Sequence, residues 1–213
     1  MTSIAMFFEF AEYKLVDVLK KSINNTLKAR IALDVAHAMN FLHKSGLIHR
    51  ELKVENIMLN SFLETKLIGL GFVRINELLV NNFSYVKDSL AKGIGSFAFM
   101  SPEMANEEEY DSKTDVYSFG IILHVIFAGN LPNQSLNEKM SGKKFKLPNP
   151  SDSISPFCIN LIEQCTVRSP LKRPSFDSIL NQLRENSFEL ASDIDPSILL
   201  KRDKELEFIE NYE

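Results

Sequence analysis

Cysteine is scarce in this sequence, since its 213 residues include only Cys158 and Cys165. The two lie seven positions apart in an apolar stretch with helical spacing, so they are expected to share one buried face. This placement favours core packing over a metal site or a disulfide. So few cysteines are typical of proteins from a reducing compartment, which predicts a cytoplasmic location.

Basic blocks and long apolar runs are also missing. Lys and Arg are scattered and the net charge is −4, so no nucleic-acid partner is expected. The apolar N-terminal segment lacks the basic region that precedes the apolar core of a signal peptide. The longest apolar run, residues 117–129, is too short to span a bilayer. It predicts a helix buried on nearly all sides, and no membrane partner.

Glycine-rich phosphate loops are absent as well. Residues 67–72 read LIGLGF, with two glycines around one leucine. A dinucleotide loop of the form G-x-G-x-x-G would need a third glycine where Arg74 stands, and the phosphate loop of ATPases would need Gly-Lys-Ser/Thr to follow. The stretch is therefore not a phosphate-binding loop in its own right.

Apolar residues recur at helical spacing through most of the chain, which predicts a mainly α-helical domain. Gly46 stands where a C-terminal helix cap is expected. Ser112 to Asp115 reads S-x-x-D, a capping box that would begin the helix through the long apolar run. Helices are expected at residues 15–21, 25–44, 112–129, 157–165 and 176–183, and from Pro196 to the end. Short strands are expected at residues 5–10, 57–60 and 65–69, the last two as a two-stranded ribbon, with an irregular segment at about 72–100.

The segment IHRELKVENIML, residues 48–59, resembles the catalytic loop of protein kinases, His-Arg-Asp-Leu-Lys-x-x-Asn. Glu51 replaces the Asp of that motif. Five other residues match at the family's spacing: His49, Arg50, Leu52, Lys53 and Asn56.

Four more segments are similar to kinase landmarks and follow in the family's order. They are KLIGLGF (66–72) at the Asp-Phe-Gly metal loop, IGSFAFMSPEM (94–104) at the end of the activation segment, DVYSFG (115–120) at the start of the central helix, and RSPLKRPSF (168–176) at the late arginine motif. Together with the catalytic loop they indicate a kinase-like fold over about residues 5–185. The pattern is most similar to the tyrosine-kinase-like group.

The resemblance implies a mainly α fold of the kinase C-lobe type, a helical bundle around a buried central helix with a short β ribbon at the catalytic loop. MFFEFAE, residues 6–12, resembles the last strand and hinge of the small N-terminal lobe. The expected division is therefore 1–14 as a remnant of that lobe, 15–187 as the C-lobe, and 188–213 as an acidic, helical tail. The tail helix could be a docking element or a solvated cover for the lobe.

The resemblance also implies a loss. In active kinases the Asp of the metal loop holds Mg²⁺ against the ATP phosphates, but here that position is Gly69. The neutral oxygen of Asn56 does not replace the carboxylate that Mg²⁺ requires. The sequence therefore predicts no metal and no cofactor; ATP and Mg²⁺ are expected only if the chain is an active kinase.

Glu51, Lys53 and Asn56 occupy the catalytic positions of the family. Glu51 is one methylene longer than Asp, and a misplacement of about 1 Å can cost roughly 100-fold in rate. Lys53 would contact the γ-phosphate in an active enzyme, and otherwise would be a surface or loop-bonding lysine. The nucleotide pocket is expected to include Phe8, Glu9, Met58 and Gly69.

Five further residues are expected to be structural. His49 would be a buried imidazole under the catalytic loop, and Arg50 would face the activation segment. Glu103 and Arg173 would form a buried ion pair. Asp115 has two compatible roles, as the acid of the capping box or, as in the family, as an acceptor of backbone N–H groups from the catalytic loop.

The expected function is that of an inactive kinase-like fragment, a pseudokinase, acting as a binding or regulatory module. The alternatives are an active Ser/Thr kinase of which this chain is an incomplete copy, and a decayed product without function. Without the small lobe, an apolar roof would be exposed, which predicts a protein partner or self-association. The roof includes Met6, Phe7, Phe8 and Phe10.

Overall fold

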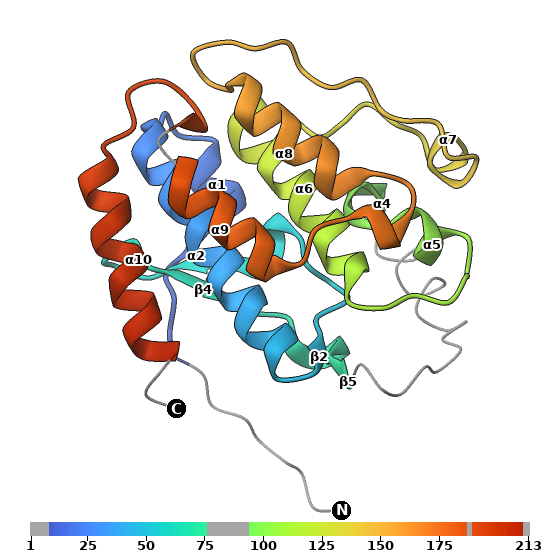
Figure 1. Cartoon of the computed structure of the whole chain (residues 1–213), viewed down its shortest axis with the longest axis horizontal. Helices are drawn as coiled ribbons and strands as arrows, with labels where there is room; N and C mark the ends of the chain where they lie inside the picture. Colours follow the sequence, from blue (N-terminus) through green and yellow to red (C-terminus); the bar gives the residue numbers. More distant parts are fainter. Residues whose placement is uncertain (1–8, 76–93, 187–188, 211–213) are drawn as a thin grey trace, which may run out of the picture.

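A computed structural model describes residues 9–75, 94–186 and 189–210, and it confirms a mainly α-helical fold (Figure 1). The helices are α1 (Leu15–Leu19), α2 (Asn25–Lys44), α4 (Ile94–Phe99), α5 (Pro102–Ala105), α6 (Lys113–Ala128), α7 (Leu136–Met140), α8 (Pro156–Thr166), α9 (Phe176–Asn186) and α10 (Pro196–Glu210). The strands are β1 (Tyr13–Lys14), β2 (Leu47–Ile48), β3 (Ile57–Leu59), β4 (Thr65–Leu67) and β5 (Arg74–Ile75). Short 3₁₀ turns are η1 (Val54–Asn56), η2 (Leu70–Phe72) and η3 (Pro170–Lys172).

Helix α6 forms the centre of the core. It packs against α8 on one side and α2 on another, and α9 packs against α2 (Figure 1). Phe119 of α6 and Phe176 of α9 meet edge to face with ring centroids 5.4 Å apart. Nearly every side chain of α6 is buried, as the unbroken apolar run predicts. Among the helices in the described ranges, none is both long and apolar enough to cross a membrane.

Helix α2 has the bounds that its sequence predicts. The Asn24 side chain accepts a hydrogen bond from the Leu27 N–H at 2.8 Å, which satisfies one of the unpaired donors of the first turn. Gly46, just past the last turn, has φ of +71°, a left-handed conformation that glycine adopts at no steric cost. Both ends of α2 are therefore set by local chemistry.

The strands differ from the expected pattern in two ways. The ribbon of β3 and β4 pairs antiparallel, Met58 opposite Lys66, but β1 adds a third strand along β3. The strand expected at residues 5–10 is not found at Glu9 and Phe10, and its earlier part lies outside the described residues. A second sheet pairs β2, where no strand is expected, with β5, and both β5 and the helix α4 lie in the segment at about 72–100 that is expected to be irregular. Elements this short carry too little periodicity to be recognised in the sequence.

The predicted capping box at the start of α6 is not formed. Ser112 has φ of −58° and ψ of −17°, and its side chain caps no backbone group. A cap residue normally has extended backbone, from which its oxygen can reach the N–H groups of the first turn. The Asp115 carboxylate instead accepts from the backbone N–H groups of His49 and Arg50, both at 2.8 Å. The carboxylate that local sequence assigns to the cap is therefore bonded to two amides of the loop before β3.

Helix α10 covers α2 with charged contacts (Figure 1). Arg202 Nε lies 2.9 Å from Asp34 Oδ1, and Asp203 Oδ1 lies 2.7 Å from His37 Nε2. Asp34 and His37 are buried on the flank of α2, so α10 supplies the partners that these polar groups need. Leu199 of α10 is also buried. The tail helix therefore packs on α2 through both ion pairs and a buried leucine.

Candidate active site

The loop between β2 and β3 is held to the core by one buried carboxylate. Besides its two bonds to the loop amides, Asp115 Oδ2 lies 2.9 Å from His43 Nε2 at the end of α2. Arg50, inside the loop, has φ of +70°, an uncommon backbone conformation for a residue with a side chain. The carboxylate therefore joins α6, α2 and a loop whose backbone requires outside support.

His49 links this loop to the segment after β4. Its Nε2 lies 3.0 Å from the Ile68 carbonyl oxygen, while Nδ1 accepts from the Glu51 N–H at 3.2 Å. The imidazole is fully buried, so it lies where a structural histidine under the loop is expected. The Arg50 guanidinium is buried too and lies 5.8 Å from the centre of the Tyr110 ring.

Glu51, Lys53 and Asn56 come together at the mouth of the loop. Lys53 Nζ lies 2.9 Å from Glu51 Oε1, and both side chains are nearly buried. The Asn56 amide donates to the Glu51 carbonyl oxygen at 2.7 Å and lies 3.4 Å from Glu51 Oε2. The turn η1 brings Asn56 back over Glu51, which explains how residues five positions apart share one site.

The described residues of the expected nucleotide pocket lie on or beside the three-stranded sheet. Glu9 Oε2 forms an ion pair with Lys66 Nζ at 2.8 Å on the three-stranded sheet. Met58 lies opposite Lys66 on β3, partly exposed, and Gly69 follows two residues after β4. Phe8 lies outside the described residues.

Glu103 and Arg173 form a buried, bidentate ion pair. Arg173 Nη1 lies 2.5 Å from Glu103 Oε1, and Nη2 lies 2.8 Å from Oε2. The remaining guanidinium N–H groups reach the carbonyl oxygens of Lys113, Val167 and Arg168 at 2.9–3.0 Å. One arginine therefore ties α5, the start of α6 and the loop after α8 together.

Comparison with known proteins identifies the family to which this chain belongs. The family model described as protein kinase domain matches residues 1–183. The chain belongs to the protein kinase family. Its structure is accordingly the protein-kinase fold, here mainly helical with a small three-stranded sheet.

Three relatives show how much of a kinase chain is matched. A probable serine/threonine-protein kinase of Dictyostelium discoideum is 35% identical over 81% of this chain and 18% of its own length. A serine/threonine/tyrosine-protein kinase of Arabidopsis thaliana is 33% identical over 73% of this chain and 39% of its own length. A probable LIM domain-containing serine/threonine-protein kinase of Dictyostelium is 34% identical over 82% of this chain and 17% of its own length. This kinase-family chain thus spans well under half of each relative.

The metal loop of this kinase-family site does not fit Mg²⁺. Gly69 has φ of +86°, and a Cβ atom placed on it would lie 2.5 Å from Asn56 Nδ2 and 2.7 Å from Asn56 Cγ. The Asn56 amide thus occupies the space that a side chain at position 69 would need. Mg²⁺ is usually bound through one or two carboxylates together with phosphate oxygens and water. Within the described ranges, no three His, Cys, Asp or Glu side chains converge to hold a metal ion.

Lys139 supports the end of the activation segment in a way that its sequence does not suggest. Its buried Nζ donates to the carbonyl oxygens of Phe97, Ala98 and Met100 at 2.7–2.8 Å. Burial lowers the pKa of Lys139 to about 7, and the charge of nearby Glu103 opposes that shift. Lys139 lies in a polar stretch typical of an exposed helix, so only the fold brings it to these carbonyl groups.

Proposed function

We propose that this kinase-family domain does not transfer phosphate and serves as a binding or regulatory module. The observation that carries the proposal is Gly69, which has no ligand to offer and whose neighbouring space is filled by Asn56. Kinases rely on Mg²⁺ to bridge the β- and γ-phosphates and neutralise their charge. The proposal includes membership of the tyrosine-kinase-like group, and it assigns the described residues to the C-lobe and part of the hinge.

The state of Glu51 supports the same conclusion. A catalytic base must face the proton that it removes, within hydrogen-bond reach. Here Glu51 Oε1 is paired with Lys53, and Oε2 faces Asn56. Both carboxylate oxygens of Glu51 are thus engaged by neighbouring side chains, so the site is arranged as a polar cluster.

The two cysteines support a cytoplasmic location, which we include in the proposal. Both lie on α8 and are buried. Burial raises the pKa of the Cys165 thiol to about 12 and raises that of Cys158 further. Buried thiols of this kind are inert and need no oxidising environment.

An active Ser/Thr protein kinase is the second candidate. Lys53 and Asn56 each still lie within hydrogen-bond reach of Glu51 at the catalytic positions. The relatives above carry names of serine/threonine kinases. An active kinase would need a metal-binding carboxylate at a position other than 69, together with phosphate-binding residues that the described segments do not supply.

Millimolar Mg-ATP is expected to leave the melting temperature of the purified chain unchanged. A ligand at 100 times its dissociation constant would stabilise the protein by about 2.7 kcal/mol, which a thermal scan detects easily. A scan with ATP and a chelator is the control. A Mg²⁺-dependent shift, or transfer of labelled phosphate that Glu51→Gln and Asn56→Ala abolish, would overturn the proposal in favour of an active kinase.

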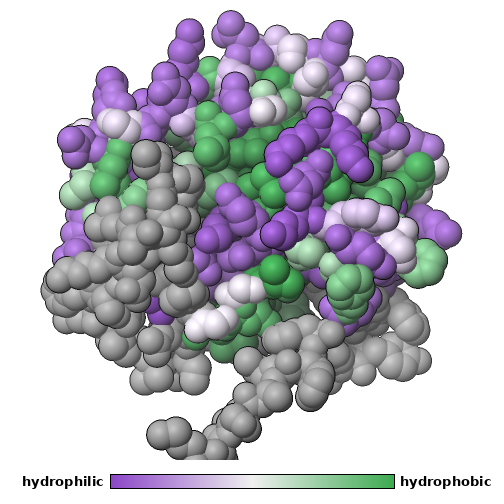
Figure 2. Space-filling model, turned by 180° about the vertical axis from the view of Figure 1, so that it is seen from behind, coloured by the Kyte–Doolittle hydropathy of each residue, from purple (hydrophilic) through white to green (hydrophobic). Residues whose placement is uncertain are grey.

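The binding surface that we propose for the module is the apolar roof at residues 4–14 and the floor of the nucleotide site. Phe10 is 78% exposed and Tyr13 45% exposed, while Met58 is partly exposed. Hydrophobic side chains also gather between polar ones on the face opposite to that of Figure 1 (Figure 2). Apolar surface left in water costs about 25 cal/mol per Å², so a partner or a second copy is favoured here.

Light scattering at micromolar concentration is expected to show self-association of the pure chain. Phe8→Asp combined with Phe10→Asp should return it to a monomer, because a charge cannot be buried unpaired in the contact. Leu171→Asp is the matched control, since Leu171 is 90% exposed but lies in η3. A monodisperse monomer that binds no hydrophobic dye would rule out the exposed roof.

A further inference from the structure

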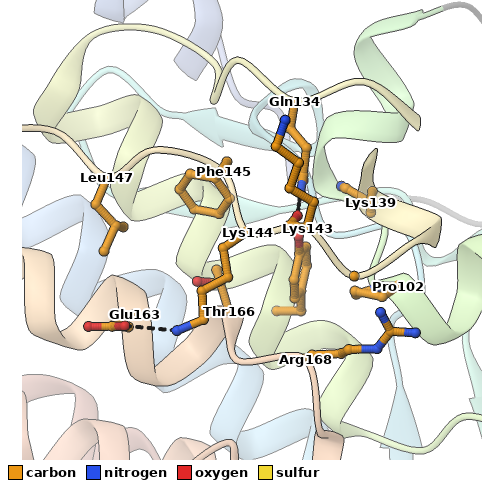
Figure 3. Close-up of a pocket in the computed structure, with 12 residues that line it drawn as sticks. Pro102, Gln134, Lys139, Lys143, Lys144, Phe145, Leu147, Glu163, Thr166 and Arg168 are labelled. Carbon is orange, nitrogen blue, oxygen red and sulfur yellow. Dashed lines mark hydrogen bonds and ion pairs between the residues drawn. The ribbon is translucent and has the colours of Figure 1, made fainter. Parts of the chain in front are cut away.

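A hollow lies between the start of α6, the loop after α7 and the end of α8 (Figure 3). It is a small hollow that opens to solvent, with a cavity volume of about 40 Å³, a few times the space that one water molecule needs. None of the catalytic-loop residues lines it. Its binding properties are therefore independent of the proposed loss of phosphate transfer.

The hollow has apolar walls and a cationic rim. Tyr117 and Phe145 are buried side chains of its wall, and Leu147 adjoins them. Lys143, Lys144 and Arg168 line the same hollow, against one lining carboxylate, that of Glu163. An apolar wall with a few convergent charged groups is the usual composition of a ligand site.

Arg168 is the most informative of these residues. A Cβ atom on Gly142 would lie 1.3 Å from Arg168 Nη1 and 2.4 Å from Cζ, so the guanidinium rests directly on the glycine backbone. Gly142 has φ of +79°, a conformation that also favours glycine. Among the described residues, no hydrogen bond or ion pair engages this guanidinium. The guanidinium of this exposed arginine thus lies against the turn without an acceptor among the described residues.

The lysines around the hollow are already paired, but unequally. Lys139 uses its three donors on the carbonyl groups of the activation segment, so it is not available to a ligand. Lys143 pairs with Glu138 at 2.5 Å and Lys144 with Glu163 at 3.0 Å, and all four side chains are well exposed. Exposed pairs of this kind contribute little stability, so Lys143 and Lys144 can turn to a stronger anion at small cost.

We propose that this hollow binds a phosphate monoester, with the phosphate oxygens on the Arg168 guanidinium and the organic group against Phe145 and Leu147. Arginine binds phosphate through two parallel N–H bonds, and the planar guanidinium group of Arg168 can offer such a pair to a ligand. Figure 3 shows Arg168 across the hollow from the Lys144–Glu163 pair, so the cations lie on two sides of the space. A doubly charged phosphate is attracted more strongly by these cations than a singly charged carboxylate is, which favours phosphate as the ligand.

Calorimetric titration of the purified chain with phenyl phosphate at low ionic strength tests this assignment. Saturable binding is expected, and benzyl alcohol, which has a ring but no charge, should not bind measurably. Arg168→Gln should weaken binding at least about tenfold, because it removes a charge-assisted hydrogen-bonded pair. Lys172→Gln is the matched control and should leave the affinity unchanged, since Lys172 is an exposed cation near Arg168 that does not line this hollow.

A second variant and a second probe make the result decisive. Gly142→Ala should weaken binding as Arg168→Gln does, because its Cβ displaces the guanidinium; melting curves recorded for each variant verify that it is folded. A phosphoserine peptide that binds more tightly than phenyl phosphate identifies a phosphorylated protein as the source of the ester, and the reverse order identifies a small molecule. No binding of either probe, or equal losses in Arg168→Gln and Lys172→Gln, would overturn the proposal.

Discussion

Arg173→Ala is expected to remove a large part of the protein's stability. The guanidinium is fully buried and forms two bonds to Glu103 and three to backbone carbonyl groups. Removing it leaves the Glu103 charge buried without a counterion, which typically costs about 3–5 kcal/mol. Domains of this size are stable by only about 5–15 kcal/mol, so the loss is a large part of the total.

Chemical denaturation followed by far-ultraviolet circular dichroism measures this effect. Lys172→Ala is the matched control, because Lys172 is the adjacent cation but is exposed. The free energy of unfolding of this control should stay within about 0.5 kcal/mol of the parent value, as is usual for surface substitutions. An Arg173→Ala midpoint that matches the parent would mean that the ion pair does not hold α5 to the core.

Asp115→Ala is expected to have the second largest effect, by releasing the catalytic loop. The backbone N–H groups of His49 and Arg50 would lose their acceptor inside the core. Each buried donor left unpaired costs about 1–3 kcal/mol, so the two together predict a loss of about 2–6 kcal/mol. The loop is then expected to leave its present conformation, because Arg50 is held at a positive φ.

Amide hydrogen exchange separates this local effect from general destabilisation. Protection at His49 and Arg50 should fall more than protection in the middle of α6. Asp177→Ala provides the control, since its carboxylate is exposed and forms only a long surface pair with Lys44 at 3.7 Å. Unchanged exchange at the two loop amides would show that Asp115 does not anchor the loop in solution.

The position of Asp115 also shows how far local sequence can be trusted. Ser112 and Asp115 have the spacing of a capping box, yet Ser112 caps nothing and Asp115 bonds to a loop more than sixty positions earlier. The family resemblance predicts this contact, because motif order carries information about distant partners. Spacing within a few residues does not, since a buried carboxylate bonds to whichever donors the fold brings near it.

The contacts among the side chains at the catalytic positions are visible only in three dimensions. The loss of the metal-loop carboxylate at Gly69 can be read from the sequence. That Asn56 fills the space beside Gly69 and that Lys53 and Asn56 both face Glu51 cannot, because side-chain directions depend on the turn η1 and the left-handed backbone of Gly69.

The sequence by itself determined the kinase family, the long helices and the ends of α2, because these follow from motif order, apolar spacing and local caps. Only the tertiary structure showed that the sheet has three strands and that Lys139 bonds to backbone carbonyl groups. It also showed that α10 packs on α2 and that the Arg168 guanidinium lies against Gly142. Each of these depends on groups far apart in the chain. A charged side chain is predicted from its own segment to lie on the surface, because charged residues are seldom buried. When the fold buries it beside a distant partner, it takes a structural role that the segment does not indicate.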